Sequence, residues 1–158
     1  MRDLIRRNRI YIYLSIVPVI AMLWYLFRPE ALFVNRSVNE TAIAASSNRA
    51  IAAGTFSGIS HQTTGEAQIL DADGKKVLRL SEFSTSNGPD VHVYLVENAS
   101  GSDTEAINKG NFVDLGVIKG NIGDQNYVLP ANVDVAQVKG VSIWCKRFGV
   151  NFGAADLK

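Results

Sequence analysis

The sequence predicts an all-β protein: an antiparallel β-sandwich or barrel-like domain that follows one N-terminal transmembrane helix. Short segments in which apolar and polar residues alternate predict the β-domain. Turns rich in Gly, Asn and Pro separate these segments about every eight to twelve residues. The helix is predicted by a long uncharged run directly after a cluster of arginines. Residues 51–158, about 108 in number, are enough for one hydrophobic core but not for two.

The first 27 residues are predicted to form a membrane anchor. Residues 1–9 hold four arginines against Asp3, and residues 10–27 carry no charge. Roughly 18 residues is about the shortest helix that spans a bilayer. Because basic residues stay on the cytoplasmic side, we expect a single-pass protein of the cell membrane with an extracytoplasmic C-terminal domain. A cleaved signal peptide is the alternative, but no small-x-small motif follows Phe27 closely.

Residues 28–50 are rich in Asn, Ser and Ala without a clear period, which predicts a tether between anchor and domain. From residue 31 onward the chain holds eleven basic and thirteen acidic side chains. A nearly neutral domain without a basic patch argues against nucleic acid as a partner.

The first predicted element of the domain is a hairpin over residues 65–81, in which two alternating segments flank the turn dipeptide Asp73-Gly74. A short helical turn is predicted later in the chain, ended by a glycine, and further strands lie around it. The helical turn covers residues 103–109, and the strands cover residues 113–118, 125–129 and 141–148.

The clearest predicted strand covers residues 91–96. Alternation gives it two distinct faces, because successive side chains of a strand point in opposite directions. The face expected to be core carries Val91, Val93 and Leu95. The opposite, polar face carries Asp90, His92 and Tyr94.

Several pieces of the domain together resemble the DM-thirteen family. The most specific are Gly88-Pro-Asp90, which continues into the strand at 91–96, and Trp144-Cys-Lys-Arg-Phe148. Further pieces lie at residues 54–65, 115–130 and 149–153. The resemblance covers nearly all of residues 51–157. It implies a β-rich extracytoplasmic domain with a suggested electron-transfer role, in which the cysteine matching Cys145 is the suspected redox residue.

The domain offers few ligands for a redox cofactor. It contains His61, His92 and Cys145 and no methionine. Cys-x-x-Cys-His is absent, so covalent haem is excluded, whereas non-covalent haem or copper could use the two histidines and the cysteine. The order of ligands in a cupredoxin loop is not reproduced, because no histidine follows Cys145. Histidines that only hydrogen-bond in place are the alternative.

Cys145 has two interpretations. It shares a predicted strand face with Val141 and Ile143, and a free cysteine on such a face is typically a buried, inert thiol. The other interpretation is a reactive thiol, because Arg147 would lie on the same face and favour the thiolate.

Asp90 and His92 lie two residues apart on one strand face, close enough for the carboxylate to orient the imidazole. Such a pair occurs in metal sites and beside general bases. A hydrolase is not indicated, because Gly-x-Ser-x-Gly is absent.

Two functions therefore remain. One is a membrane-anchored domain that transfers electrons or exchanges thiols through Cys145, with or without a cofactor, and meets a redox partner protein. The other is a non-catalytic extracytoplasmic binding or adhesion module.

Overall fold

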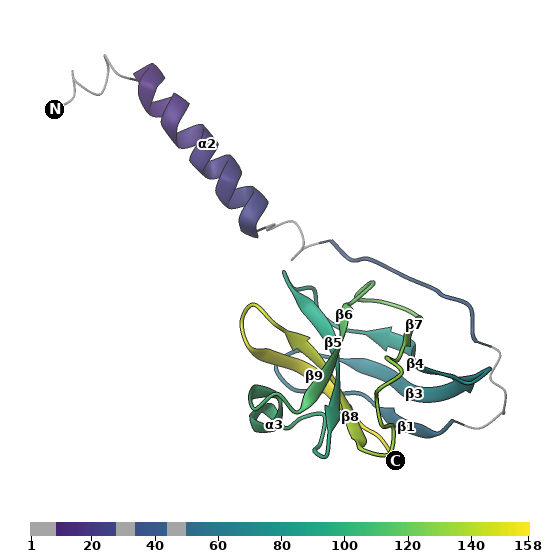
Figure 1. Cartoon of the computed structure of the whole chain (residues 1–158). Helices are drawn as coiled ribbons and strands as arrows, with labels where there is room; N and C mark the ends of the chain where they lie inside the picture. Colours follow the sequence, from purple (N-terminus) through teal and green to yellow (C-terminus); the bar gives the residue numbers. More distant parts are fainter. Residues whose placement is uncertain (1–8, 28–33, 44–49) are drawn as a thin grey trace.

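The computed structural model describes residues 9–27, 34–43 and 50–158. From residue 50 onward the chain forms two antiparallel sheets with the main hydrophobic core between them (Figure 1). The four-stranded sheet has the order β1 (Ala52–Thr55), β3 (Thr64–Ala72), β4 (Lys75–Ser84) and β7 (Gln125–Val128). The five-stranded sheet has the order β2 (Ser57–Gly58), β9 (Val150–Asp156), β8 (Val138–Cys145), β5 (Val91–Glu97) and β6 (Phe112–Val117). The predicted sandwich is confirmed, and within these residues neither sheet closes into a barrel.

The predicted hairpin is strands β3 and β4, which stay in register from Glu66 to Ala72. Its turn has positive φ at both central residues, 52° at Asp73 and 82° at Gly74. This is the arrangement of a type I′ turn, whose twist matches that of the flanking strands. The Asp-Gly dipeptide therefore explains the local register of the four-stranded sheet.

A single residue carries the chain from one sheet to the other near the start of the domain. Strand β1 pairs with β3, strand β2 pairs with β9, and Phe56 lies between β1 and β2. Its side chain is 4% exposed and makes an edge contact with Phe83, ring centroids 5.2 Å apart. The crossing residue is thus an apolar anchor between the layers.

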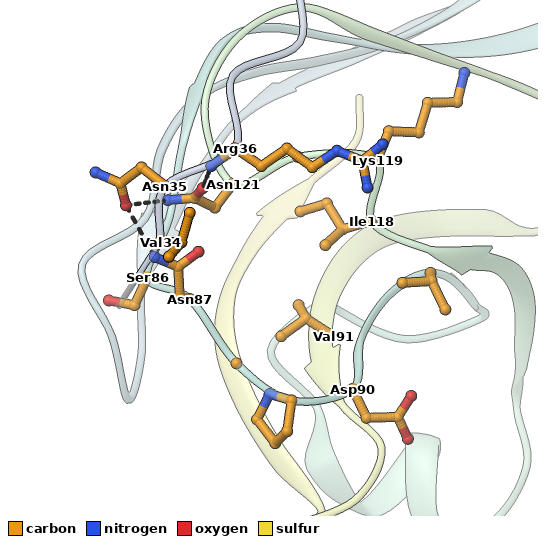
Figure 2. A pocket seen from close by; sticks show the side chains of 14 residues that line it. Val34, Asn35, Arg36, Ser86, Asn87, Asp90, Val91, Ile118, Lys119 and Asn121 are labelled. Atoms are coloured by element: carbon orange, nitrogen blue, oxygen red, sulfur yellow. Dashed lines mark hydrogen bonds between the residues drawn. The ribbon is translucent and has the colours of Figure 1, made fainter. Parts of the chain in front are cut away.

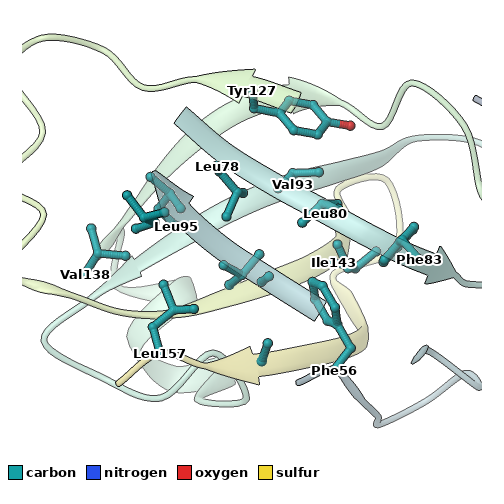
Figure 3. Packing of buried hydrophobic residues seen from close by; sticks show 14 of the residues in the cluster. Phe56, Leu78, Leu80, Phe83, Val93, Leu95, Tyr127, Val138, Ile143 and Leu157 are labelled. Atoms are coloured by element: carbon teal, nitrogen blue, oxygen red, sulfur yellow. The ribbon is translucent and has the colours of Figure 1, made fainter. Parts of the chain in front are cut away.

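The main core draws side chains from both sheets, as Figure 3 shows for Leu78 and Leu80 of β4 and for Val93 and Leu95 of β5. The predicted core face of residues 91–96 is confirmed, because its three apolar residues are at most 3% exposed. On the predicted polar face His92 and Tyr94 are buried as well, which the alternation did not indicate. A second cluster covers it, formed by Tyr94, Val96, Ala106, Ile107 and Trp144.

Helix α3 (Thr104–Asn108) supplies part of that second cluster and confirms the predicted helical turn. Asp103 caps it, because its carboxylate accepts a hydrogen bond of 3.0 Å from the backbone N–H of Ala106. The cap begins the helix at Thr104, which directs Ala106 and Ile107 onto the five-stranded sheet.

The last predicted strand, residues 141–148, is wrong at its end. Strand β8 stops at Cys145, and a turn over residues 146–149 leads into β9. Gly149, with φ of 63°, closes this turn. Phe148, which the predicted strand included, lies in this turn and is 65% exposed. Sequence alternation continues through the turn and hides the point at which pairing stops.

The described part of the predicted tether lies along the domain. We call residues 34–41 the strap. Its backbone pairs with the loop before β7: the N–H of Val38 donates to the carbonyl of Ile122 at 2.9 Å, and the N–H of Glu40 to that of Asp124 at 2.9 Å. The strap, which belongs to the predicted tether, is therefore docked on the domain over much of its length. The rest of the predicted tether, residues 28–33 and 44–49, lies outside the described residues.

Helix α2 (Arg9–Phe27) contains Pro18 and exposes apolar side chains such as Tyr11, Leu14 and Trp24. Among the described residues no helix combines the length and apolarity needed to cross a bilayer. The predicted span over residues 10–27 is thus not supported by the structure and stays a prediction. The predicted cytoplasmic residues 1–8 lie outside the described part of the chain.

Candidate functional site

The strongest polar cluster of the domain centres on His92, on the face of β5 that points away from the main core. The ring nitrogen Nδ1 lies 2.9 and 3.0 Å from the two carboxylate oxygens of Asp114, and Nε2 lies 3.1 Å from Oδ1 of Asp90. The His92 side chain is only 11% exposed. We call Asp90, His92, Asp114 and Lys146 the His92 site.

Three separate segments build the His92 site. Asp90 ends the turn before β5, Asp114 comes from the neighbouring strand β6, and Lys146 follows β8. The N–H of Lys146 donates to the carbonyl of Asp90 at 2.9 Å, and its Nζ lies 3.5 Å from Asp114. Strand pairing on both sides of β5 thus converges on one imidazole.

The predicted orientation of His92 by Asp90 agrees with this geometry, whereas sequence reasoning missed Asp114. In the sequence, Asp114 was only one carboxylate on a predicted strand, which is a weak indication of a site. The pairing of β5 with β6 is what brings it to the imidazole. That pairing is irregular between His92 and Tyr94, where the register shifts. A bulge of this kind redirects a side chain and cannot be read from alternation alone.

The electrostatics of Asp114 follow from this cluster. Burial opposes its ionisation, but the hydrogen bonds from His92 and from the N–H of Gly116, with the charges of His92 and Lys146, outweigh burial and hold the pKa of Asp114 below its usual range. Both imidazole nitrogens can donate only when both carry a proton. The imidazole therefore lies between two carboxylates, with one ring nitrogen within hydrogen-bond distance of each.

An aromatic stack lies beside the His92 site. Tyr94 is stacked on Phe112, with ring centroids 4.1 Å apart and planes 16° apart, and its centroid lies 6.3 Å from that of Trp144. The His92 ring meets Tyr94 edge-on at 6.1 Å. Burial, followed by the negative charges of Asp114 and Asp90, raises the pKa of Tyr94 to about 12. Tyr94 is therefore neutral at every physiological pH.

Cys145 lies on the other side of the same sheet. It is 0% exposed, belongs to the main core and is a free cysteine. Its cross-strand partner is Val91, whereas that of His92 is Trp144. Since neighbouring residues of a strand face opposite sides, the sheet itself separates the thiol from the imidazole. Arg147 lies in the turn after β8, so the predicted shared face of Cys145 and Arg147 does not form.

His61 lies in the segment between β2 and β3, half buried, with its ring 3.9 Å from that of Phe152. The cofactor ligands considered from the sequence, His61, His92 and Cys145, are therefore held in three different settings. Among the described residues no group of three His, Cys, Asp or Glu side chains is arranged to hold a metal ion. Both His92 nitrogens also already bind carboxylates, so these residues do not fit a shared copper or haem centre.

A cavity of about 440 Å³ adjoins the His92 site (Figure 2). The strap and two loops line it, and Asp90 belongs to both the cavity and the His92 site. The turn with the Gly88-Pro89-Asp90 motif forms one wall of this cavity. Residues 117–121, from a second motif piece, form another.

Comparison with protein families identifies the domain. Residues 55–157 match the family described as electron transfer DM13. The chain belongs to the DM13 family. The match confirms the resemblance seen in the motifs and assigns the domain a general electron-transfer role. No curated protein matches the chain, and no solved structure does.

The motif pieces of the DM13 domain meet at the His92 site. Asp90 belongs to the Gly-Pro-Asp piece and Lys146 to the Trp-Cys-Lys-Arg-Phe piece, and the two are joined by a backbone hydrogen bond of 2.9 Å. The piece that starts at Leu115 joins the same turn, because the N–H of Ile118 donates to the carbonyl of Val91 at 2.9 Å. Segments far apart in the sequence therefore assemble into one surface of the domain.

Proposed function

We propose that this chain is an electron-transfer protein whose DM13 domain meets its redox partner at the His92 site. The observation that supports this most directly is the convergence of the family's motif pieces on Asp90, His92 and Lys146. The site has charged groups at the surface and a buried aromatic stack behind them. Charged groups orient a docking partner, and an aromatic layer excludes water from the path behind them.

Within this proposal Cys145 remains a candidate redox residue, but for electron transfer rather than thiol exchange. Thiol–disulfide exchange needs direct attack by a thiolate on a sulfur, which a fully buried side chain does not allow. Electron transfer needs no such contact: the thiol would give one electron to an oxidised partner protein, lose its proton, and be restored by an electron and a proton from a reduced partner protein. Cys145 pairs with Val91, the residue between Asp90 and His92, which keeps it close to the His92 site although it faces the opposite side of the sheet.

We also propose that the domain works outside the cytoplasm and is held at the cell membrane through residues 10–27. The support is the arginine cluster, the uncharged run and the exposed apolar side chains of helix α2. Protease added to right-side-out spheroplasts should digest the domain without detergent. A domain that is cut only after detergent treatment would contradict this topology.

Absorbance and electron exchange of the purified full chain test the electron-transfer proposal. We expect the protein to exchange electrons with a small soluble mediator, and His92→Gln to slow the exchange by about tenfold, or about 1.4 kcal/mol of activation free energy. Lys109→Gln, at the exposed C-terminal cap of helix α3, is the matched control and should change nothing. A colourless protein that exchanges no electrons, alone or in native membranes, would contradict the proposal.

The second candidate function is a binding module, and the cavity next to the His92 site favours it. Its volume of about 440 Å³ lies within the range of small-molecule sites, about 300 to 1,000 Å³. In a pure binding module, ligand would bind in this cavity, and neither the unmodified protein nor His92→Gln would exchange electrons. The electron-exchange measurement therefore separates the two candidates.

A further inference from the structure

The cavity beside the His92 site is formed partly by the matched domain and partly by residues that lie outside the family match. The DM13 match begins at residue 55, whereas one wall of the cavity is the strap. The other walls are the turn before β5 and the loop after β6. The cavity thus exists only because the strap is docked on the domain. Its main lining residues are Val34, Arg36, Pro89, Val91, Ile118 and Asn121.

Specific contacts hold the strap in place at the cavity. The backbone N–H of Arg36 donates to Oδ1 of Asn121 at 2.7 Å, and Nδ2 of Asn121 donates to Oδ1 of Asn35 at 3.0 Å. Asn87 donates to the same oxygen of Asn35 at 2.9 Å. Gly120 permits this approach, since a Cβ there would lie 2.4 Å from the carbonyl oxygen of Arg36. This wall of the cavity is therefore built by side chains from three segments.

An ion pair fastens the strap further along. Lys119 Nζ lies 2.7 and 2.9 Å from the carboxylate oxygens of Glu40, which also accepts the N–H of Asn126 at 2.7 Å. The hydrogen bond from Lys119 is the main reason that the pKa of Glu40 lies below its usual range. Arg79 pairs with Asp124 nearby and reaches the strap carbonyls of Glu40 and Thr41. The ammonium of Lys119 is thus committed to the strap and not to the cavity.

Two charged groups besides Lys119 line the cavity, the guanidinium of Arg36 and the carboxylate of Asp90. Figure 2 shows the Arg36 side chain extending across the cavity toward Lys119, with Asp90 at the opposite end. The Asp90 carboxylate is bound by His92 at 3.1 Å. Within the described ranges no carboxylate pairs with the Arg36 guanidinium. The amides of Asn35, Asn87 and Asn121 are bonded largely to one another, which leaves the guanidinium as the charged group available to a ligand.

The walls between these two ends are mainly apolar. Val91, Ile118 and Pro89 lie along them, and Val34 of the strap adds a further apolar side chain. An apolar body would therefore be desolvated there, while a guanidinium at one end pairs best with a planar anion such as a carboxylate. The volume of about 440 Å³ limits the ligand to a small molecule.

We propose that this cavity binds a small organic anion with an apolar body, whose carboxylate or comparable group pairs with Arg36. The cavity shares Asp90 with the His92 site, but the group that would bind the anion is Arg36 of the strap, so the proposal does not depend on the proposed electron transfer. Since the strap forms one wall, the ligand binds only to the docked strap and stabilises that state.

The test uses the full chain in uncharged detergent micelles and two probes of the same shape, naphthalene-2-carboxylate and naphthalene-2-carboxamide. Backbone amide shifts of Gly88, Val91 and Gly120 report binding in the cavity rather than on helix α2. We expect saturable shifts with the carboxylate and at least about tenfold weaker binding of the neutral carboxamide. Equal affinities for the two probes, or no shifts at these amides up to about 10 mM carboxylate, would overturn the proposal.

Variants of Arg36 locate the anionic group. Arg36→Gln should weaken binding of the carboxylate by about tenfold, and Arg36→Lys should restore part of it. Lys109→Gln removes an equal charge at the C-terminal cap of helix α3 and should leave binding unchanged. Unchanged binding in Arg36→Gln would refute the role of Arg36. If that variant releases the strap, seen as a shift of the Ile122 amide, the two probes on the unmodified chain still decide the question.

Discussion

Strand β5 borders two buried layers that differ in chemistry. On one side Val91, Val93 and Leu95 enter a core of aliphatic and aromatic side chains, in which the thiol of Cys145 is also enclosed. On the other side His92 and Tyr94 are buried too, but among carboxylates, an indole and a phenyl ring. The first side makes the domain stable, and the second concentrates its ionisable groups.

The comparison shows that a buried residue of β5 does not have to face the core between the two sheets. His92 is 8% exposed and Cys145 is 0% exposed, yet only His92 has polar partners on two sides. A buried polar group needs such partners, because an unpaired one costs about 1 to 3 kcal/mol. The outer face, on which the buried imidazole has such partners, is therefore where function is to be sought.

The largest expected effect is a loss of stability when the layer around His92 and Tyr94 is disrupted. We expect Tyr94→Ala to lower the free energy of unfolding by about 3 to 5 kcal/mol, because it removes a ring that is 2% exposed and stacked on Phe112. Val93→Ala in the main core should cost about 1 to 3 kcal/mol. Urea unfolding measures both. A smaller loss for Tyr94→Ala than for Val93→Ala would show that the outer layer is only a loosely packed cover.

The second prediction concerns the enclosed thiol. Cys145→Ser should lower the free energy of unfolding by about 1 to 3 kcal/mol, because the hydroxyl gains no partner in an apolar core, and Cys145→Ala should cost less. In the unmodified protein a thiol reagent should label Cys145 only as the domain unfolds. Fast labelling of the native protein would mean that the core side of β8 opens locally.

The third prediction uses pH to sharpen the contrast. The pKa of Asp114 is lowered in the folded state, so its contribution to stability is present above its unfolded pKa and is lost as the pH falls through the folded pKa. Asp114→Asn should therefore cost about 1 to 2 kcal/mol near neutral pH and flatten the acid side of the stability curve. Unfolding free energies from about pH 7 down to pH 3 measure this. An unchanged acid slope would mean that the ion pair adds nothing.

The smallest effect is expected from the Tyr94 hydroxyl. Tyr94→Phe should change the free energy of unfolding at neutral pH by less than about 1 kcal/mol. Because the pKa of Tyr94 is raised to about 12, its neutral form favours the folded state, and this contribution is lost as the pH rises from the unfolded pKa of 10.0 to about 12. Absorbance titration of phenolate measures it, with Tyr127, whose pKa burial also raises to about 12, as the internal reference. If the unmodified protein and Tyr94→Phe gave identical phenolate titrations above pH 10, the raised pKa assigned to Tyr94 would be contradicted.

Much of the fold could be predicted because it depends on local pattern. Alternation identified residues 91–96 and their core face, Asp73-Gly74 identified the hairpin, and Asp103 begins the helix that was expected. Strands β1, β2 and β9 were not predicted. The first two are short, and the small residues Gly153, Ala154 and Ala155 of β9 give little alternation.

By itself the sequence determined the antiparallel sandwich, the family, the burial of Val91, Val93 and Leu95, and the proximity of Asp90 to His92, because these depend on neighbours within a few residues. Only the tertiary structure decided that Asp114 reaches His92, that Cys145 lies on the opposite face, and that the strap closes a cavity with Arg36 in it. Those outcomes depend on which strands pair, in which register, and where pairing stops. Such long-range pairing is selected by the packing of the whole domain, and a single strand does not encode it.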